Sequence, residues 1–120
     1  MARVVHFEIP AKDVEKVVDF YKKVFNWEIT HWEGQTDYWL IKTGEAPEMG
    51  IDGAVYKSGE IMDKTVNTIA VEDINSAIDK IKSNGGQVVT KIDTIPGIGL
   101  FAYAVDVEGN SFGILQPLMG

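Results

Sequence analysis

The hydrophobic and polar positions alternate along residues 4–9 and then change to a helical spacing. Within residues 4–9 the apolar side chains fall on one face of an extended chain, and His6 and Glu8 fall on the other. Apolar residues then recur every three or four positions through residues 14–25, and Asp13 precedes them as a suitable N-cap. The pattern predicts a half-buried strand followed by an amphipathic helix.

The rest of the chain continues as strands, with a second helix near its middle. Asn26 suits the left-handed residue that often ends a helix, and the turn chemistry of residues 108–110 predicts a closing hairpin. Asp73 is the expected N-cap of the second helix. That helix is predicted at residues 74–81, and strands at residues 27–32, 38–41, 51–56, 68–71, 88–89, 100–105 and 112–116.

The second half of the pattern repeats the first at an offset of 60 residues. This offset places Asp13 on Asp73 and also pairs His6 with Val66 and Gly53 with Gly113. We therefore expect one α+β domain over residues 1–120, made of two βαβββ repeats at about residues 3–57 and 64–118. Each repeat is expected to form a curved antiparallel sheet covered by one helix, and the two sheets to surround a cavity.

The amino-acid composition and charge of the chain exclude several classes of function. A net charge of −7 over 120 residues, without a basic patch, argues against nucleic acid as a partner. The absence of Cys excludes disulfides and thiolate chemistry. No apolar run approaches the ~20 residues of a membrane span, and the first residues do not form a signal peptide. We expect a cytoplasmic protein that has no membrane partner.

Short motifs in a fixed order resemble the vicinal-oxygen-chelate superfamily, which includes glyoxalase I, bleomycin-resistance proteins and extradiol dioxygenases. The resemblance covers nearly the whole chain and is strongest with small glyoxalase-like members. It implies a homodimer, sometimes with exchanged repeats. It rests on residues 6–11, 20–21, 24–27, 71–73, 85–86, 101–102, 108–110, 112–113 and 115–116, with Asp13 and Asp106.

The resemblance also implies where a metal would be held. Metal-dependent members use four side chains, typically His or Glu. The matching positions here are His6, Gly53 or a residue next to it, Val66 or its neighbour Asn67, and Gly113. Only His6 carries a ligand group, whereas a catalytic metal generally needs about three protein ligands. No metal cofactor is therefore expected; a divalent Zn, Ni, Fe or Mn ion held by substitute ligands is the alternative. The two glycines are expected to leave open space in the cavity.

Two functional hypotheses stay open. The first is a bleomycin-resistance-like protein that encloses a small molecule without metal chemistry. The second is an enzyme, a glyoxalase-like lyase or isomerase or a dioxygenase-like protein, that acts on a small oxygenated substrate. In such an enzyme, His6 and Glu8 would serve as the catalytic acid and base or as partial metal ligands. The expected ligand-binding residues are His6, Glu8, Trp39, Asn67, Phe101, Tyr103 and Gln116.

Overall fold

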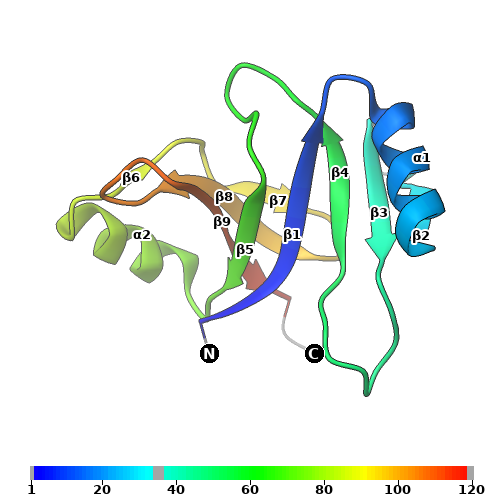
Figure 1. The fold of residues 1–120 in the computed structure, drawn as a ribbon. Helices are drawn as coiled ribbons and strands as arrows, with labels where there is room; N and C mark the ends of the chain where they lie inside the picture. Colours follow the sequence, from blue (N-terminus) through cyan, green and yellow to red (C-terminus); the bar gives the residue numbers. More distant parts are fainter. Residues whose placement is uncertain (1, 34–36, 119–120) are drawn as a thin grey trace. The chain divides into compact units, whose positions relative to one another are not determined.

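The computed structural model of the chain describes residues 2–33 and 37–118 (Figure 1). The first half contains β1 (Arg3–Ala11), α1 (Val14–Phe25), β2 (Glu28–His31), β3 (Tyr38–Lys42) and β4 (Gly53–Lys57). The second half contains β5 (Val66–Ala70), α2 (Ile74–Ser83), β6 (Gln87–Val88), β7 (Asp93–Ile95), β8 (Gly99–Val105) and β9 (Ser111–Pro117).

The chain divides into two compact units. Residues 6–65 form one unit, and residues 66–120 form the other together with the first five residues. Each half follows the βαβββ order, and the second adds β7, a short strand that the sequence pattern did not predict. The α+β class and the two repeats with one helix each are thereby confirmed. No helix in the described residues is long and apolar enough to cross a membrane.

The sheets are mixed, which corrects the expectation that they are antiparallel. In the unit of residues 6–65 the strand order is β2-β3-β4-β1, with β1 parallel to β4 and the other pairs antiparallel. In the other unit the order is β5-β9-β8-β6, β7 pairs with β8, and β5 is parallel to β9. The parallel pairs arise because a helix and further strands carry the chain around before it returns beside the first strand.

Helix α1 packs on one face of its sheet. The Asp13 side chain accepts a hydrogen bond from the Lys16 backbone N at 3.2 Å, and Asn26 ends the helix in the left-handed conformation at φ 59°. Buried side chains of the helix meet those of the strands in a core of Ala11, Val14, Val18, Ile29, Ile41 and Val55. Because these strand residues alternate with His6 and Glu8, the two polar residues lie on the opposite face of the sheet.

Helix α2 covers the equivalent face in the other unit. Asp73 accepts hydrogen bonds from the backbone N of Asn75 at 3.0 Å and of Ser76 at 3.3 Å, so it caps the helix as predicted. The fully buried core between helix and sheet consists of Ile74, Ala102 and Ile114. Phe101 and Tyr103 alternate with this core along β8 and therefore face away from α2.

Candidate functional site

The candidate site is a polar cluster of His6, Glu8 and Tyr38 on the face of its sheet that points away from α1. His6 and Glu8 come from β1, whereas Tyr38 comes from β3, two strands away. The intervening strand presents Ala54 opposite Glu8. Because Ala54 carries only a methyl group, the Tyr38 side chain can reach across β4 to β1. We call His6, Glu8 and Tyr38 the His6 cluster.

Two hydrogen bonds join the three side chains. The Tyr38 hydroxyl donates to Glu8 Oε2 at 2.5 Å, and His6 Nε2 lies 3.1 Å from the same hydroxyl oxygen. Glu8 is only 4% exposed. A buried carboxyl group is costly unless it is hydrogen-bonded, and the phenol supplies such a bond. The cluster therefore holds a His, a carboxyl group and a phenol in fixed contact.

Burial determines the protonation states of His6 and Tyr56 on this face of the sheet. It lowers the pKa of His6, although the carboxylates of Glu8 and Asp52 act in the opposite direction. The imidazole of His6 is therefore neutral at neutral pH. Burial, followed by the charge of Glu8, raises the pKa of the nearby Tyr56 to about 12. The Tyr56 hydroxyl donates to the Lys64 carbonyl at 2.6 Å, so Tyr56 stays a neutral donor.

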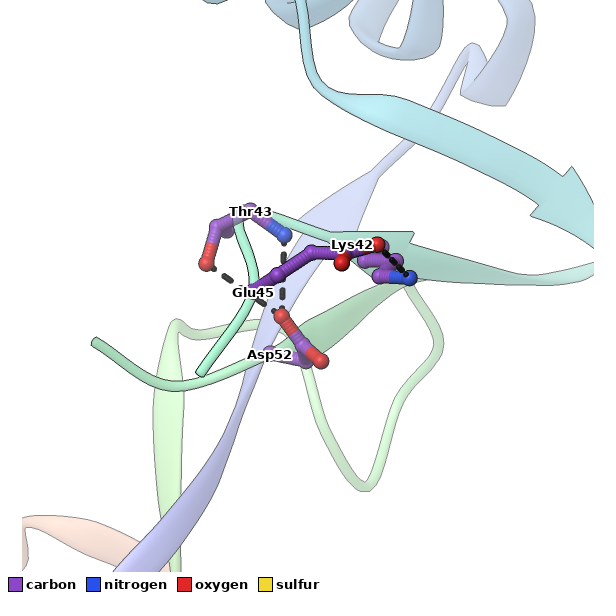
Figure 2. Close-up of polar contacts among 4 residues, drawn as sticks. All are labelled: Lys42, Thr43, Glu45 and Asp52. Carbon is purple, nitrogen blue, oxygen red and sulfur yellow. Dashed lines mark hydrogen bonds and ion pairs between the residues drawn. The ribbon is translucent and has the colours of Figure 1, made fainter. Parts of the chain in front are cut away.

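Asp52 is held in place by the loop that connects β3 to β4 (Figure 2). Its Oδ1 accepts hydrogen bonds from the Thr43 backbone N at 2.9 Å and the Thr43 hydroxyl at 3.3 Å. At the end of β3, Lys42 Nζ contacts Glu45 Oε1 at 2.6 Å, so the ammonium group is paired with a carboxylate. The charge of Asp52 acts on His6, where it raises the pKa against the larger effect of burial.

The strand register identifies which residue at or next to Gly53 occupies the position implied by the family resemblance. Phe7 pairs with Gly53 and Glu8 with Ala54, whereas Thr68, the repeat counterpart of Glu8, pairs with Gly113. The counterpart of Gly113 is therefore Ala54, one residue beyond Gly53. Gly53 lies in register with Phe7 on the face that packs against α1. The sequence comparison missed this because the connecting loops of the two repeats differ by one residue.

Neither glycine leaves the open space that was expected. A Cβ at Gly53 would lie 2.5 Å from the Phe7 carbonyl oxygen and 2.6 Å from its ring. A Cβ at Gly113 would lie 2.7 Å from the ring of Phe101. The two phenylalanine rings therefore occupy the volume above the glycines, and the close packing needs glycine at both positions.

The remaining predicted ligand-binding residues are divided among several places. Phe101 and Tyr103 do lie together, with an edge-on contact of 4.7 Å between ring centroids. Trp39 packs against the core beneath α1, on the other face of the sheet from the His6 cluster. Asn67 is exposed and pairs in register with Phe112 on the α2 side. Gln116 uses its Oε1 to accept the Ile74 backbone N–H at 2.9 Å, so it caps α2.

The donor groups do not fit the family's divalent metal. The four corrected positions are His6, Ala54, Val66 and Gly113, and only the first has a side chain that binds metals. Within residues 2–33 and 37–118, no three His, Asp or Glu side chains are grouped so that they could hold an ion. The side chains that the structure brings together on this face are those of the His6 cluster.

Sequence reasoning missed two aromatic residues of the site. Neither Tyr38 nor Trp32 was among the expected ligand-binding residues. Their ring centroids lie 5.5 Å apart at 62°, so Trp32 adjoins the hydroxyl-bearing ring of the cluster. Side chains alternate along β3, so the sequence alone places Tyr38 on the opposite face to Trp39. Only the pairing of β3 with β4 shows that Tyr38 lies toward Glu8.

Comparisons with known proteins agree with this architecture. Residues 3–114 match the model of the Glyoxalase/Bleomycin resistance protein/Dioxygenase superfamily. A glyoxylase-like domain-containing protein of Didymella fabae is 30% identical over 89% of this chain and 88% of its own length. The fosfomycin resistance protein FosX of Listeria monocytogenes is 24% identical, over 89% of this chain and 84% of its own.

Solved structures of low sequence identity share the fold. Methylmalonyl-CoA epimerase from Mycobacterium tuberculosis has a TM-score of 0.70 at 12% identity, covering 97% of this chain and 88% of its own. A variant of the Streptomyces coelicolor methylmalonyl-CoA epimerase, in complex with 2-nitronate-propionyl-CoA, has a TM-score of 0.73 at 14% identity and covers 99% of both chains. At these identities the likeness concerns the fold alone.

Proposed function

The chain belongs to the Glyoxalase/Bleomycin resistance protein/Dioxygenase superfamily, and we propose that it binds a small molecule at the His6 cluster without the family's divalent metal. The observation that carries this proposal is the pair of hydrogen bonds that join His6, Tyr38 and Glu8 on the sheet face away from α1. A few convergent polar groups beside aromatic rings are typical of a small-molecule site. Trp32 supplies such a ring beside Tyr38.

A second candidate is a metal-independent lyase or isomerase that acts on a small oxygenated substrate. Its support is the neutral imidazole of His6, which is able to accept a proton at neutral pH. Between His6 and Glu8 lies the Tyr38 hydroxyl, which is hydrogen-bonded to both side chains, so in this candidate His6 is the residue that meets the substrate. Fosfomycin and methylmalonyl-CoA, which appear in the names of similar proteins, serve as the anionic compounds in the substrate test.

Trp32 fluorescence tests the binding proposal directly. A panel of neutral, cationic and anionic oxygenated compounds, including fosfomycin and methylmalonyl-CoA, is titrated while Trp emission is recorded. We expect at least one compound to quench the emission, and the quench to disappear in Trp32→Phe. Trp27→Phe is the matched control, because Trp27 stacks on Tyr21 at 5.0 Å beside α1 and its loss should leave the quench in place.

Two further measurements separate the candidates. Recovery of every compound unchanged, as judged by proton NMR, is expected for a binding protein, whereas conversion abolished by His6→Ala supports the enzyme. Elemental analysis after titration with zinc, nickel, manganese and iron tests the metal. A stoichiometric ion that is lost in His6→Ala contradicts the metal-free proposal. If no compound changes Trp32 emission, the binding proposal itself is wrong.

A further inference from the structure

We propose that the His6 cluster presents the Nδ1 lone pair of His6 to its ligand, and that it selects uncharged or cationic hydrogen-bond donors over anions. This inference rests on the proposed binding function and specifies its ligand class. An alcohol, a hydrated carbonyl, an amide N–H or an ammonium group has the required chemistry. A carboxylate, phosphate or phosphonate does not.

The tautomer of His6 follows from the number of protons on Tyr38. A phenol has one hydroxyl proton, and Tyr38 donates that proton to Glu8 Oε2 at 2.5 Å. The Tyr38 oxygen can therefore only accept from His6 Nε2, which lies 3.1 Å away. A neutral imidazole carries one N–H, so the proton on Nε2 leaves Nδ1 as an acceptor. The chain from His6 through Tyr38 to Glu8 thus fixes the imidazole in one tautomer.

The Nδ1 atom is accessible to a ligand. Of the two ring nitrogens, Nε2 alone has a hydrogen-bond partner within the part of the chain that the structure describes. Nδ1 is not among the buried side-chain atoms that lack a partner, because within that part Thr68 Oγ1 alone meets this description. Nδ1 is therefore not completely buried, and its lone pair is left to accept a hydrogen bond from a bound molecule.

The local charges set the preferred charge of the ligand. The charged groups that act on His6 are the carboxylates of Glu8 and Asp52, and Asp52 is fixed in this region by Thr43. Lys42, the last residue of β3, is paired with Glu45. An anionic ligand would meet an acceptor lone pair and two negative groups, whereas a neutral or cationic donor meets complementary charge. The net charge of −7 acts in the same direction.

Nitrogen-15 NMR of the His side chains tests the tautomer without any ligand. The chain has two His residues, and His31→Gln identifies the signals of His6. At neutral pH we expect a protonated Nε2 and an unprotonated Nδ1 in the wild-type protein. In Tyr38→Phe the acceptor of Nε2–H is lost, and we expect the tautomer preference to fall. A wild-type spectrum with the proton on Nδ1 overturns the inference, even if the variant does not fold.

Four small fragments, each a phenyl ring that carries one carbon with a different polar group, test the ligand class. Benzyl alcohol and benzylammonium are expected to shift the His6 Nδ1 signal. Benzyl methyl ether, which lacks a donor, should bind about tenfold more weakly, and benzoate should cause no shift. His31 serves as the internal control, since it contacts Trp39 rather than the cluster.

The outcomes distinguish this inference from the function on which it rests. Benzoate that shifts His6 as strongly as benzyl alcohol overturns the ligand class, while binding at the cluster still stands. If Nε2 is protonated but no fragment shifts His6, and the larger panel leaves Trp32 emission unchanged, the binding function fails and the ligand class fails with it. In that case the tautomer remains a property of the fold.

Discussion

A single methyl group decides whether the candidate site exists. Ala54 is fully buried and lies between β1 and β3 on the face of Glu8 and Tyr38. A larger side chain at this position would separate the Tyr38 hydroxyl from Glu8. The sequence alone gave Ala54 no role, because its importance depends on which strands are neighbours. The contacts within the His6 cluster thus depend on a residue outside the cluster.

Thr68 carries a buried hydroxyl group that should lower stability. It is 2% exposed, and its Oγ1 has no hydrogen-bond partner in the described residues. Because an unsatisfied buried hydroxyl is costly, we expect Thr68→Val to raise the free energy of unfolding by about 1 kcal/mol. Urea denaturation measures this change. Thr68→Ser keeps the hydroxyl and loses a methyl group, so it should destabilise the protein, and equal stability of both variants contradicts the explanation.

Tyr56 should make the protein sensitive to alkaline pH. Burial raises its pKa to about 12, whereas an unfolded Tyr has a pKa of about 10. Above pH 10 the unfolded chain therefore loses this proton first, so the stability that Tyr56 contributes is present below pH 10 and lost as pH rises toward 12. Between pH 9 and 11 we expect a loss of about 1 kcal/mol from this residue.

Tyr56→Phe is the matched variant for this pH dependence. It removes the ionisable group, along with the hydrogen bond to the Lys64 carbonyl, so its stability is lower at pH 9. The relevant quantity is the further loss between pH 9 and pH 11, measured by urea denaturation. That loss should be smaller in the variant than in the wild-type protein. Identical losses mean that Tyr56 ionises equally easily in the folded and unfolded chain.

At the scale of elements, the pairing of β1 with β4 places Gly53 against Phe7. A Cβ at position 53 would lie 2.5 Å from the Phe7 carbonyl oxygen, which belongs to the strand ladder and cannot move independently. We expect Gly53→Ala to lower the free energy of unfolding by roughly 2 kcal/mol or more. Gly59→Ala is the control, because nothing lies within 4 Å of its added Cβ, and it should change stability by less than about 1 kcal/mol. Similar urea midpoints for the two variants rule out this register.

At the scale of the whole molecule, the homodimer stays a prediction. Two chains that each carry a net charge of −7 repel one another, and salt screens this repulsion. Sedimentation equilibrium should therefore give twice the mass of one chain at physiological salt, with more monomer at low salt. The mass of a single chain at every salt and protein concentration contradicts the prediction.

The sequence by itself determined the elements and the family. Period-two and helical spacings marked most strands and both helices, Asp13 and Asp73 marked the helix starts, and the offset of 60 residues revealed two βαβββ units. These features are local or repeated, so each segment specifies them without its partners. His6 and Glu8 were placed on one face for the same reason.

Tertiary structure alone decided the contents of the site. Which strands are adjacent, and in which register, brought Tyr38 from β3 to Glu8 and moved the counterpart of Gly113 from Gly53 to Ala54. A shift of one residue turns a side chain to the other face of a strand, and sequence alignment across loops of unequal length cannot fix such a shift. The proton order from His6 to Glu8 likewise depends on distances between atoms of different strands.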